Sequence, residues 1–235
     1  MKTNILAGLS VLIAGTVLAA ETSPKDAVLA AAKKLGDTQN YAWKSVAVVP
    51  EDAPFTPGPT EGKTEKDGFT LFSMTIFENQ FKVAAKGDLR ALTDQEGNWK
   101  SVAEVEKEEG PGRFGALIAR NLKTPAREAA ELAGYAKELK KEGEAYSSDL
   151  TEAGAKAMQT FRPAGSDGGP SVSDAKGSVK FWLKDGTLTK YEFKLKGLIK
   201  FGDNEFPNDR TTTVEIKDVG TTKVEIPEAA KKKLQ

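Results

Sequence analysis

The sequence predicts an α+β fold: a curled antiparallel β-sheet, shaped as an incomplete barrel, with helices covering its apolar concave face. The predicted elements follow the order helix, strands, helices, strands, without the strand–helix alternation of a parallel sheet. In the C-terminal third, apolar and polar residues alternate with a period of two, as in strands with one dry and one wet face. A twisted sheet of this many strands curls, so its concave side is either filled by helices or left partly open for a ligand.

Residues 1–20 have the pattern of a secretory signal peptide. One lysine precedes the uncharged apolar residues 5–18, and small residues follow before the chain turns polar. This run is shorter than the about 20 apolar residues that span a bilayer. We therefore expect cleavage after Ala19 or Ala20, with an uncleaved anchor as the alternative. The mature part, residues 21–235, is expected to be a single domain, monomeric, and periplasmic or secreted.

A short amphipathic helix is predicted directly after the signal peptide. Ser23 can cap it, Pro24 suits its first position, and Gly36 is expected to stop it. Its apolar face has helical spacing and consists of Val28, Leu29, Ala32 and Leu35. Such a helix needs a surface to pack against.

The next part of the chain predicts strands, beginning with residues 41–49, which are rich in aromatic and β-branched side chains. Repeated prolines then make residues 50–60 a Pro-rich surface loop or mobile flap. An antiparallel meander of short hairpins follows, with strands over residues 69–77, 81–86, 89–93 and 99–105.

Residues 112–158 are predicted to be mainly helical. Residues 114–122 are apolar on most faces, which indicates a buried helix. Thr124 and Pro125 begin a second helix, expected to end at Gly143, with charged residues on its solvent side and an apolar face of Leu132, Tyr135, Ala136 and Leu139.

The segments that follow predict a short helix and several loops. Residues 151–158 form the short helix, and the Gly/Ser-rich residues 164–176 are expected to be a flexible loop. Residues 203–205 together with 208–209 are interpreted as a turn or a cluster of Asx turns.

Alternation is clearest near the C-terminus. Asp185 and Gly186 predict a hairpin turn between two strands. Residues 213–219 and 222–227 are expected to form a closing pair of short strands. The apolar stripe on the dry face of these strands consists of Val179, Phe181, Leu183, Tyr191, Phe193, Leu195, Val214 and Ile216.

The composition excludes several classes of chemistry. The 235 residues contain no Cys and no His, which rules out Ser-His-Asp and Cys-His nucleophiles, disulfides and zinc fingers. The 34 basic residues equal the 34 acidic ones, which argues against nucleic acid as a partner. No spacing indicates a catalytic carboxylate pair, a calcium loop or a phosphate loop. We expect no enzyme activity, no metal and no cofactor.

Four stretches together are similar to a known family: residues 40–44 after the first helix, residues 86–90 with 97–99, residues 145–158, and the closing strand pair. With them the chain resembles the LolA/LolB superfamily of periplasmic lipoprotein and lipid carriers, including the actinobacterial lipid-carrier lipoproteins. The resemblance implies an incomplete barrel closed by a helical lid, with an apolar interior that holds acyl chains. The lipoprotein relatives have a lipidated Cys that this chain lacks, so we expect no lipid anchor.

The function predicted from these observations is to bind or carry an apolar ligand, a lipid or lipoprotein acyl chains, between sheet and helical lid. The stripe that includes Phe181 and Phe193 is the predicted lining, and an ordinary packed core is the alternative interpretation of it. Expected partners are a lipid or lipoprotein, with transient contacts to the membrane or to envelope proteins. The alternative functions are a non-catalytic structural or interaction module of the envelope with a filled core, and a carboxylate hydrolase.

The wet face of the same strands carries a lysine patch. It could attract anionic head groups or an acidic partner, or simply keep the face soluble and protect the sheet edge. Trp182 falls on this face by alternation, and we expect lysine stems to bury it in part. The patch consists of Lys180, Lys184, Lys190, Lys194, Lys196 and Lys200.

Overall fold

The computed structural model describes residues 22–53, 56–76, 79–108, 112–160 and 170–235. The predicted signal peptide and residues 164–169 of the predicted flexible loop lie outside these ranges. The helices are α1 (Pro24–Asp37), α2 (Val102–Val105), α3 (Gly112–Asn121), α4 (Pro125–Tyr135), α5 (Glu152–Ala157) and α6 (Glu228–Lys231). The strands are β1 (Asn40–Val48), β2 (Thr60–Glu65), β3 (Phe69–Ile76), β4 (Asn79–Lys86), β5 (Leu89–Thr93), β6 (Trp99–Ser101), β7 (Lys140–Glu142), β8 (Ala145–Asp149), β9 (Ser171–Lys184), β10 (Thr187–Phe201) and β11 (Asn204–Lys217).

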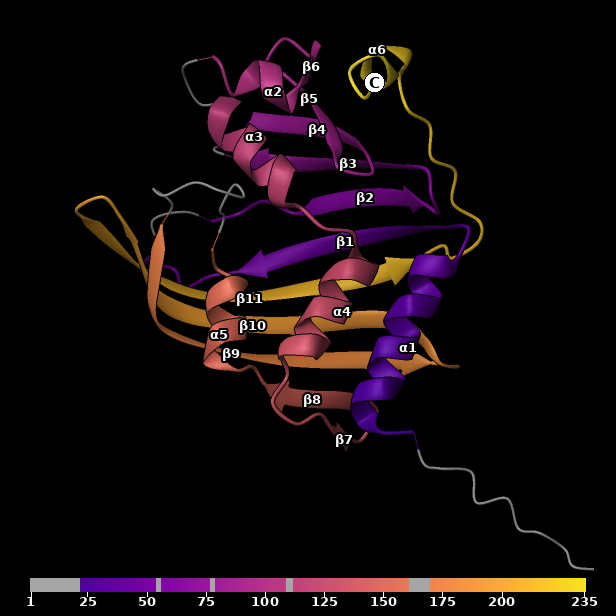
Figure 1. Cartoon of the computed structure of the whole chain (residues 1–235), viewed down its shortest axis with the longest axis vertical. Helices are drawn as coiled ribbons and strands as arrows, with labels where there is room; N and C mark the ends of the chain where they lie inside the picture. Colours follow the sequence, from indigo (N-terminus) through magenta and orange to yellow (C-terminus); the bar gives the residue numbers. More distant parts are fainter. Residues whose placement is uncertain (1–21, 54–55, 77–78, 109–111, 161–169) are drawn as a thin grey trace, which may run out of the picture.

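All the described strands belong to one antiparallel sheet in the order β6-β5-β4-β3-β2-β1-β11-β10-β9-β8-β7. β6 and β7 are its two edges, so the sheet stays open. Helices lie over one face in two groups: α1, α4 and α5 cover β8 to β11, and α2 with α3 covers β4 and β5 (Figure 1). The predicted fold class, an α+β curled antiparallel sheet, is confirmed. Among the described residues, no helix has the length and hydropathy needed to cross a bilayer.

α1 begins as its sequence predicts. The Ser23 hydroxyl accepts a hydrogen bond from the Asp26 amide at 3.1 Å, and Pro24 occupies the first turn. The helix includes Gly36 and ends one residue later, capped by Thr38. Its buried face packs against α4 and β10, and consists of Val28, Ala31, Ala32 and Leu35.

α4 is shorter than predicted. It ends at Tyr135, and the charged residues that follow are extended and enter the hairpin of β7 and β8. Gly143, the predicted helix stop, has a φ of +62° and makes the turn of that hairpin. The predicted solvated helix face over residues 137–141 is therefore wrong, because backbone pairing of Ala136 with Leu150 redirects the chain along the sheet edge.

The strand predicted over residues 99–105 is wrong in its second half. β6 ends at Ser101, and α2 starts there with a capping box. The Ser101 hydroxyl accepts from the Glu104 amide at 3.2 Å, and the Glu104 carboxylate accepts from the Ser101 amide at 2.7 Å. These local bonds satisfy the first amides of α2. The β-branched residues of the segment predict a strand and do not reveal this cap.

β2 is a strand that the sequence analysis missed, since its sequence TEGKTE is polar and contains glycine. It pairs with β1 and β3 on its two sides. A Cβ on Gly62 would lie 2.3 Å from two ring atoms of Trp43, so the indole lies directly on the Gly62 backbone. The Trp43 Nε1 group donates to the Thr64 hydroxyl at 3.2 Å, and its ring packs against Phe72 with centroids 6.1 Å apart.

The C-terminal strands are longer than predicted. Residues 171–176, predicted as part of a loop, begin β9. Residues 204–209, interpreted as a turn, begin β11, and the turn itself lies just before them at Gly202. Residues 222–227 form no strand, so the predicted closing pair is wrong in its second member. The Asp185-Gly186 turn is confirmed, with φ values of 51° and 68°.

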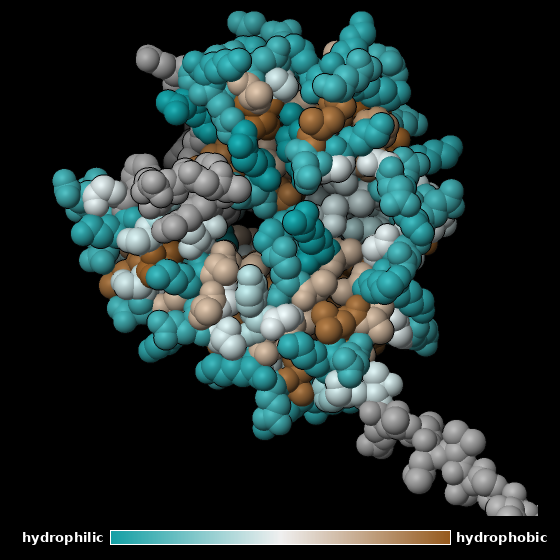
Figure 2. Space-filling model, in the orientation of Figure 1, coloured by the Kyte–Doolittle hydropathy of each residue, from teal (hydrophilic) through white to brown (hydrophobic). Residues whose placement is uncertain are grey.

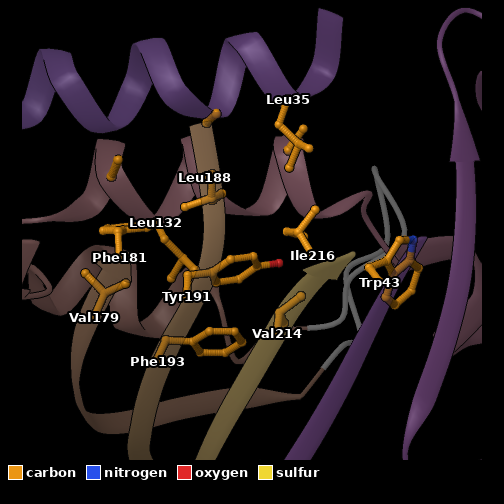
Figure 3. Packing of buried hydrophobic residues seen from close by; sticks show 14 of the residues in the cluster. Leu35, Trp43, Leu132, Val179, Phe181, Leu188, Tyr191, Phe193, Val214 and Ile216 are labelled. Carbon is orange, nitrogen blue, oxygen red and sulfur yellow. The ribbon is translucent and has the colours of Figure 1, made fainter. Parts of the chain in front are cut away.

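The core occupies the face under the helices. There Tyr191 lies beside Phe181 and Phe193, with Leu132 of α4 above them (Figure 3). At the β4–β5 end the opposite face is buried too, because residues 224–234 pack over Ala84 and Ala91 and cover them completely. The prediction of one dry and one wet face, made for the C-terminal strands, is confirmed for β9 to β11, whereas β4 and β5 are buried on both faces. The helix-bearing surface itself is mostly hydrophilic, with small hydrophobic patches (Figure 2).

The close contact between Trp43 and Gly62 predicts that a methyl group added at position 62 destabilises the protein. Gly62→Ala should lower the free energy of unfolding by about 1–3 kcal/mol, because the added Cβ overlaps the indole and neither strand can move away. Urea denaturation measures this change. Gly134→Ala is the matched control: it lies exposed in α4 with open space around it, and should raise stability by up to about 1 kcal/mol. A Gly62 variant as stable as the wild type would contradict the close contact.

Candidate functional site

A cavity of about 560 Å³ lies between the sheet and the two groups of helices. Its floor is formed by β1, β3, β10 and β11, and its walls by α3, α4 and the loop between β1 and β2. Most of the lining is apolar, including Met74, Leu117, Ile118, Leu122, Phe193 and Ile199. This cavity is the candidate functional site.

The cavity follows from a change in side-chain size along β1. On its core-facing side Tyr41 and Trp43 are large and buried, whereas Ser45 and Ala47 are small. Ala47 pairs across the sheet with Thr212, so the neighbouring strand adds no bulk there. The connection between α3 and α4 passes over this part of the sheet, so no helix fills the space there.

The Pro-rich loop predicted over residues 50–60 forms one wall of the cavity. Pro50, Asp52, Ala53, Pro57 and Gly58 all line it. At Gly58 the loop lies tight on β3, since a Cβ there would lie 2.7 Å from the Cβ of its β3 neighbour. The segment is therefore part of the site rather than an unrelated surface loop.

The lining also contains five charged residues: Asp52, Lys123, Glu128, Asp209 and Arg210. Glu128 of α4 accepts a hydrogen bond from the Tyr191 hydroxyl at 2.6 Å. Burial raises the pKa of Glu128 and outweighs the lowering by the tyrosine bond and by the Arg210 charge. Burial likewise raises the pKa of Tyr191 well above its ordinary value, and the Glu128 charge adds to this.

Arg210 of β11 faces the cavity from the sheet. Burial lowers its pKa, and its Nε group has no hydrogen-bond partner among the described residues. None of these residues forms an ion pair with it. A cation held in this state beside apolar walls is costly unless something compensates its charge.

A second cavity of about 370 Å³ lies on the other side of the α3–α4 connection. Leu122 and Lys123 border both cavities, so this connection is the partition between them. Lys123 forms an ion pair with Glu131. The lining of the second cavity is more charged than that of the first and includes Glu65, Asp67, Arg90 and Arg127.

A buried amide pair closes the larger cavity near α5. Gln159 is 2% exposed, donates to the carbonyls of Ala155 and Lys196, and accepts from the Asn208 side chain at 2.7 Å. These bonds tie the end of α5 to the β10–β11 hairpin. They satisfy both amides within the protein, so this corner is structural.

The structure places the eight residues of the predicted lining in two different environments. Phe193 borders the 560 Å³ cavity, and its ring stacks on Tyr191 with centroids 6.3 Å apart. The other seven lie deeper, packed under the helices or at the hairpin end, and contact neither cavity: Val179, Phe181, Leu183, Tyr191, Leu195, Val214 and Ile216. A ligand role for these seven stays a prediction.

Sequence reasoning missed Arg210 and Glu128, although one signal for Arg210 was present. Arg210 has the same strand parity as Thr212 and Val214, so it is a charge on the dry face of β11. The strand was predicted to begin only at residue 213, which hid the alternation. Glu128 carried no such signal, because any first-turn glutamate of a helix is ordinary.

The predicted lysine patch on the outer face is interrupted by acids. Lys194 and Lys196 both pair with Asp209, at 3.4 and 2.7 Å. The Lys190 ammonium lies 4.6 Å from the Trp182 ring centroid, as expected for a tryptophan partly covered by a lysine. The described residues contain no cluster of carboxylates that could hold a metal ion.

No family model and no curated protein matches the chain. Solved structures do. LprF from Mycobacterium bovis is 12% identical, with 88% of this chain and 97% of that chain covered and a TM-score of 0.49. The lipoprotein LppX from Mycobacterium tuberculosis is 8% identical, with 85% and 98% covered and a TM-score of 0.40.

The raised pKa of Glu128 predicts a pH-dependent effect on stability. The folded protein holds this proton more tightly than the unfolded chain, so the group stabilises the fold below the ordinary value of 4.5 and loses that contribution as pH rises through its raised pKa. Glu128→Gln should therefore gain stability over the wild type at about pH 8 and little at about pH 4. Urea denaturation at the two pH values measures the difference.

Glu104 is the control with the opposite sign. Hydrogen bonds from Lys233 and Ser101 lower its pKa to about 2. Its contribution to stability is therefore present above pH 4.5 and is lost as the pH falls from 4.5 toward about 2. Glu104→Gln should lose stability at neutral pH and approach the wild type in acid. Parallel pH profiles for the two variants would contradict the assignment of Glu128.

Proposed function

We propose that this protein binds an apolar ligand, a lipid or the acyl chains of a lipoprotein, in the cavity between sheet and helices. The observation that carries the proposal is the 560 Å³ cavity itself, whose volume falls within the about 300–1,000 Å³ of ligand pockets. Its lining matches the usual composition of such pockets, with mostly apolar side chains and a few polar groups.

The energetics favour a flexible apolar chain as the occupant. Each methylene group moved from water into the cavity contributes about 0.8 kcal/mol. An empty apolar cavity lacks these contacts, so its walls gain packing when a chain enters. Such binding needs no covalent step, in keeping with the expectation that the protein is not an enzyme.

The cavity is partly open to solvent, and movement of its wall would widen this opening for a long acyl chain. The floor is a hydrogen-bonded sheet, whereas other parts of the wall are irregular: residues 49–53 and 56–59 after β1, and the three-residue connection between α3 and α4. We propose that these segments open to admit and release the ligand, as loops do in many binding proteins. Carriage between the membrane and envelope proteins would then follow from reversible binding in an exported protein.

The alternative function, an envelope interaction module with a filled core, is less favoured. A filled core would place a large side chain at Ala47 or a helix above it, and the structure has neither.

Extraction of the purified mature protein with organic solvent, followed by mass spectrometry, tests the proposal directly. Co-purified lipid at a fixed molar ratio is the expected result. Titration with a fluorescent anilinonaphthalene probe, displaced by lipid, gives the affinity. A chain that carries no lipid and does not bind the probe would contradict the proposal.

Filling the cavity should abolish binding without unfolding the protein. Ala47→Trp places an indole in the cavity, and we expect probe and lipid binding to fall at least about tenfold because the ligand loses the space. Val48→Trp is the matched control, since the adjacent residue points to the other face and is 64% exposed. Equal binding by both variants would place the ligand elsewhere.

A further inference from the structure

The apolar walls of the larger cavity do not compensate the charge of Arg210. Arg210 lines the larger cavity, its buried Nε group is unpartnered, and no ion pair to it exists among the described residues. The residue lies just beyond the end of β1, whose last paired residue, Val48, is opposite Thr211. The side chain therefore lies beside the cavity rather than beneath a neighbouring strand.

The nearest compensating group is already engaged. Glu128 accepts the Tyr191 hydroxyl, and it interacts with Arg210 through its charge, without a hydrogen bond between them. The other cation at the cavity, Lys123, has its own partner in Glu131. Of the two cations that line this cavity, Arg210 is therefore the one whose N–H groups have no acceptor among the described residues.

A guanidinium has a fixed fork of donors that matches the oxygens of a carboxylate or a phosphate. Placed at one side of an apolar cavity, it would fix the polar end of a ligand whose chain fills the remaining space. Glu128 on the facing wall would limit access to this end, since a charged glutamate repels an anion and a protonated one can donate to it.

The second cavity offers a weaker case. Its Arg90 also has an unpartnered Nε group, but the same guanidinium donates to the Gly87 and Leu89 carbonyls. Both cavities have acidic residues in their lining, Glu65 and Asp67 here and Asp52, Glu128 and Asp209 in the larger one, so the available donors of the arginine decide between them. The larger cavity combines an available cation with apolar walls.

We propose that the ligand of the larger cavity is an amphiphile with an acidic head group, and that the head group's oxygens bind the guanidinium of Arg210. This inference rests on the proposed function and adds to it the chemistry of the ligand's polar end. A carboxylate of a fatty acid and a phosphate of a phospholipid share this chemistry.

Three probes of equal chain length separate the head group from the chain. Dodecanoic acid, dodecyl phosphate and dodecanol are titrated against the full mature chain loaded with the anilinonaphthalene probe, below their micelle concentrations. The acids should displace the probe at about tenfold to a hundredfold lower concentration than the alcohol, as expected for hydrogen bonds to a charged group. The stronger of the two acids identifies the source of the head group.

Two variants assign the difference to specific residues. Arg210→Met should remove the preference for acids and leave dodecanol unchanged. Glu128→Gln should tighten the binding of both acids, because it removes the facing negative charge, with no effect on dodecanol. Arg113→Met is the matched control: it is an exposed arginine of α3 outside both cavities, and should change nothing.

The outcomes separate the two proposals. Absence of probe binding contradicts the proposed function itself. Equal binding of acid and alcohol by the wild type overturns the head-group site and leaves the apolar cavity standing. Arg210→Met should melt no lower than the wild type, because it removes an unpaired charge. A large loss of stability would assign Arg210 a structural role and overturn the inference, with the Glu128→Gln titration as the independent check.

Discussion

β1 is hydrogen-bonded to β2 on one side and to β11 on the other, and this double pairing joins the N-terminal strands to the C-terminal ones. The register sets Trp43 opposite both Gly62 and Ile216, so a large side chain meets a glycine on one side. Four residues further along, Ala47 meets Thr212, and the same face of the sheet becomes hollow. The helices then divide into two groups, each packed where the sheet presents large side chains, and the cavity lies where it does not.

The hollow has a physical cost, and its position suggests why the chain tolerates it. Unfilled apolar space loses packing contacts, and Arg210 and Glu128 are ionisable groups placed where charge is costly. A core selected for stability alone would replace them by well-packed apolar residues. Local choices that oppose stability gather at functional sites in natural proteins. In this protein such choices are concentrated around one cavity.

Sequence reasoning succeeded where local chemistry decides the outcome. Capping by Ser23, the Asp185-Gly186 turn, and the alternation through Tyr191 and Phe193 all depend on residues close in sequence. It failed where pairing with distant strands outweighs local preference. The polar segment of β2 is a strand because β1 and β3 hold it from both sides, and Ala136 leaves the helical pattern because it meets Leu150 at the sheet edge.

The sequence by itself determined the class of the fold and the side chains that are available: no thiol, no imidazole, and strands with an apolar face. It also determined that Phe193 belongs to that face. Only the tertiary structure decided which part of the face is filled, because filling depends on where helices from another part of the chain come to lie. For the same reason, only the structure brought Arg210 of β11 and Glu128 of α4 to one cavity, since the 81 residues between them leave no local pattern that relates the two.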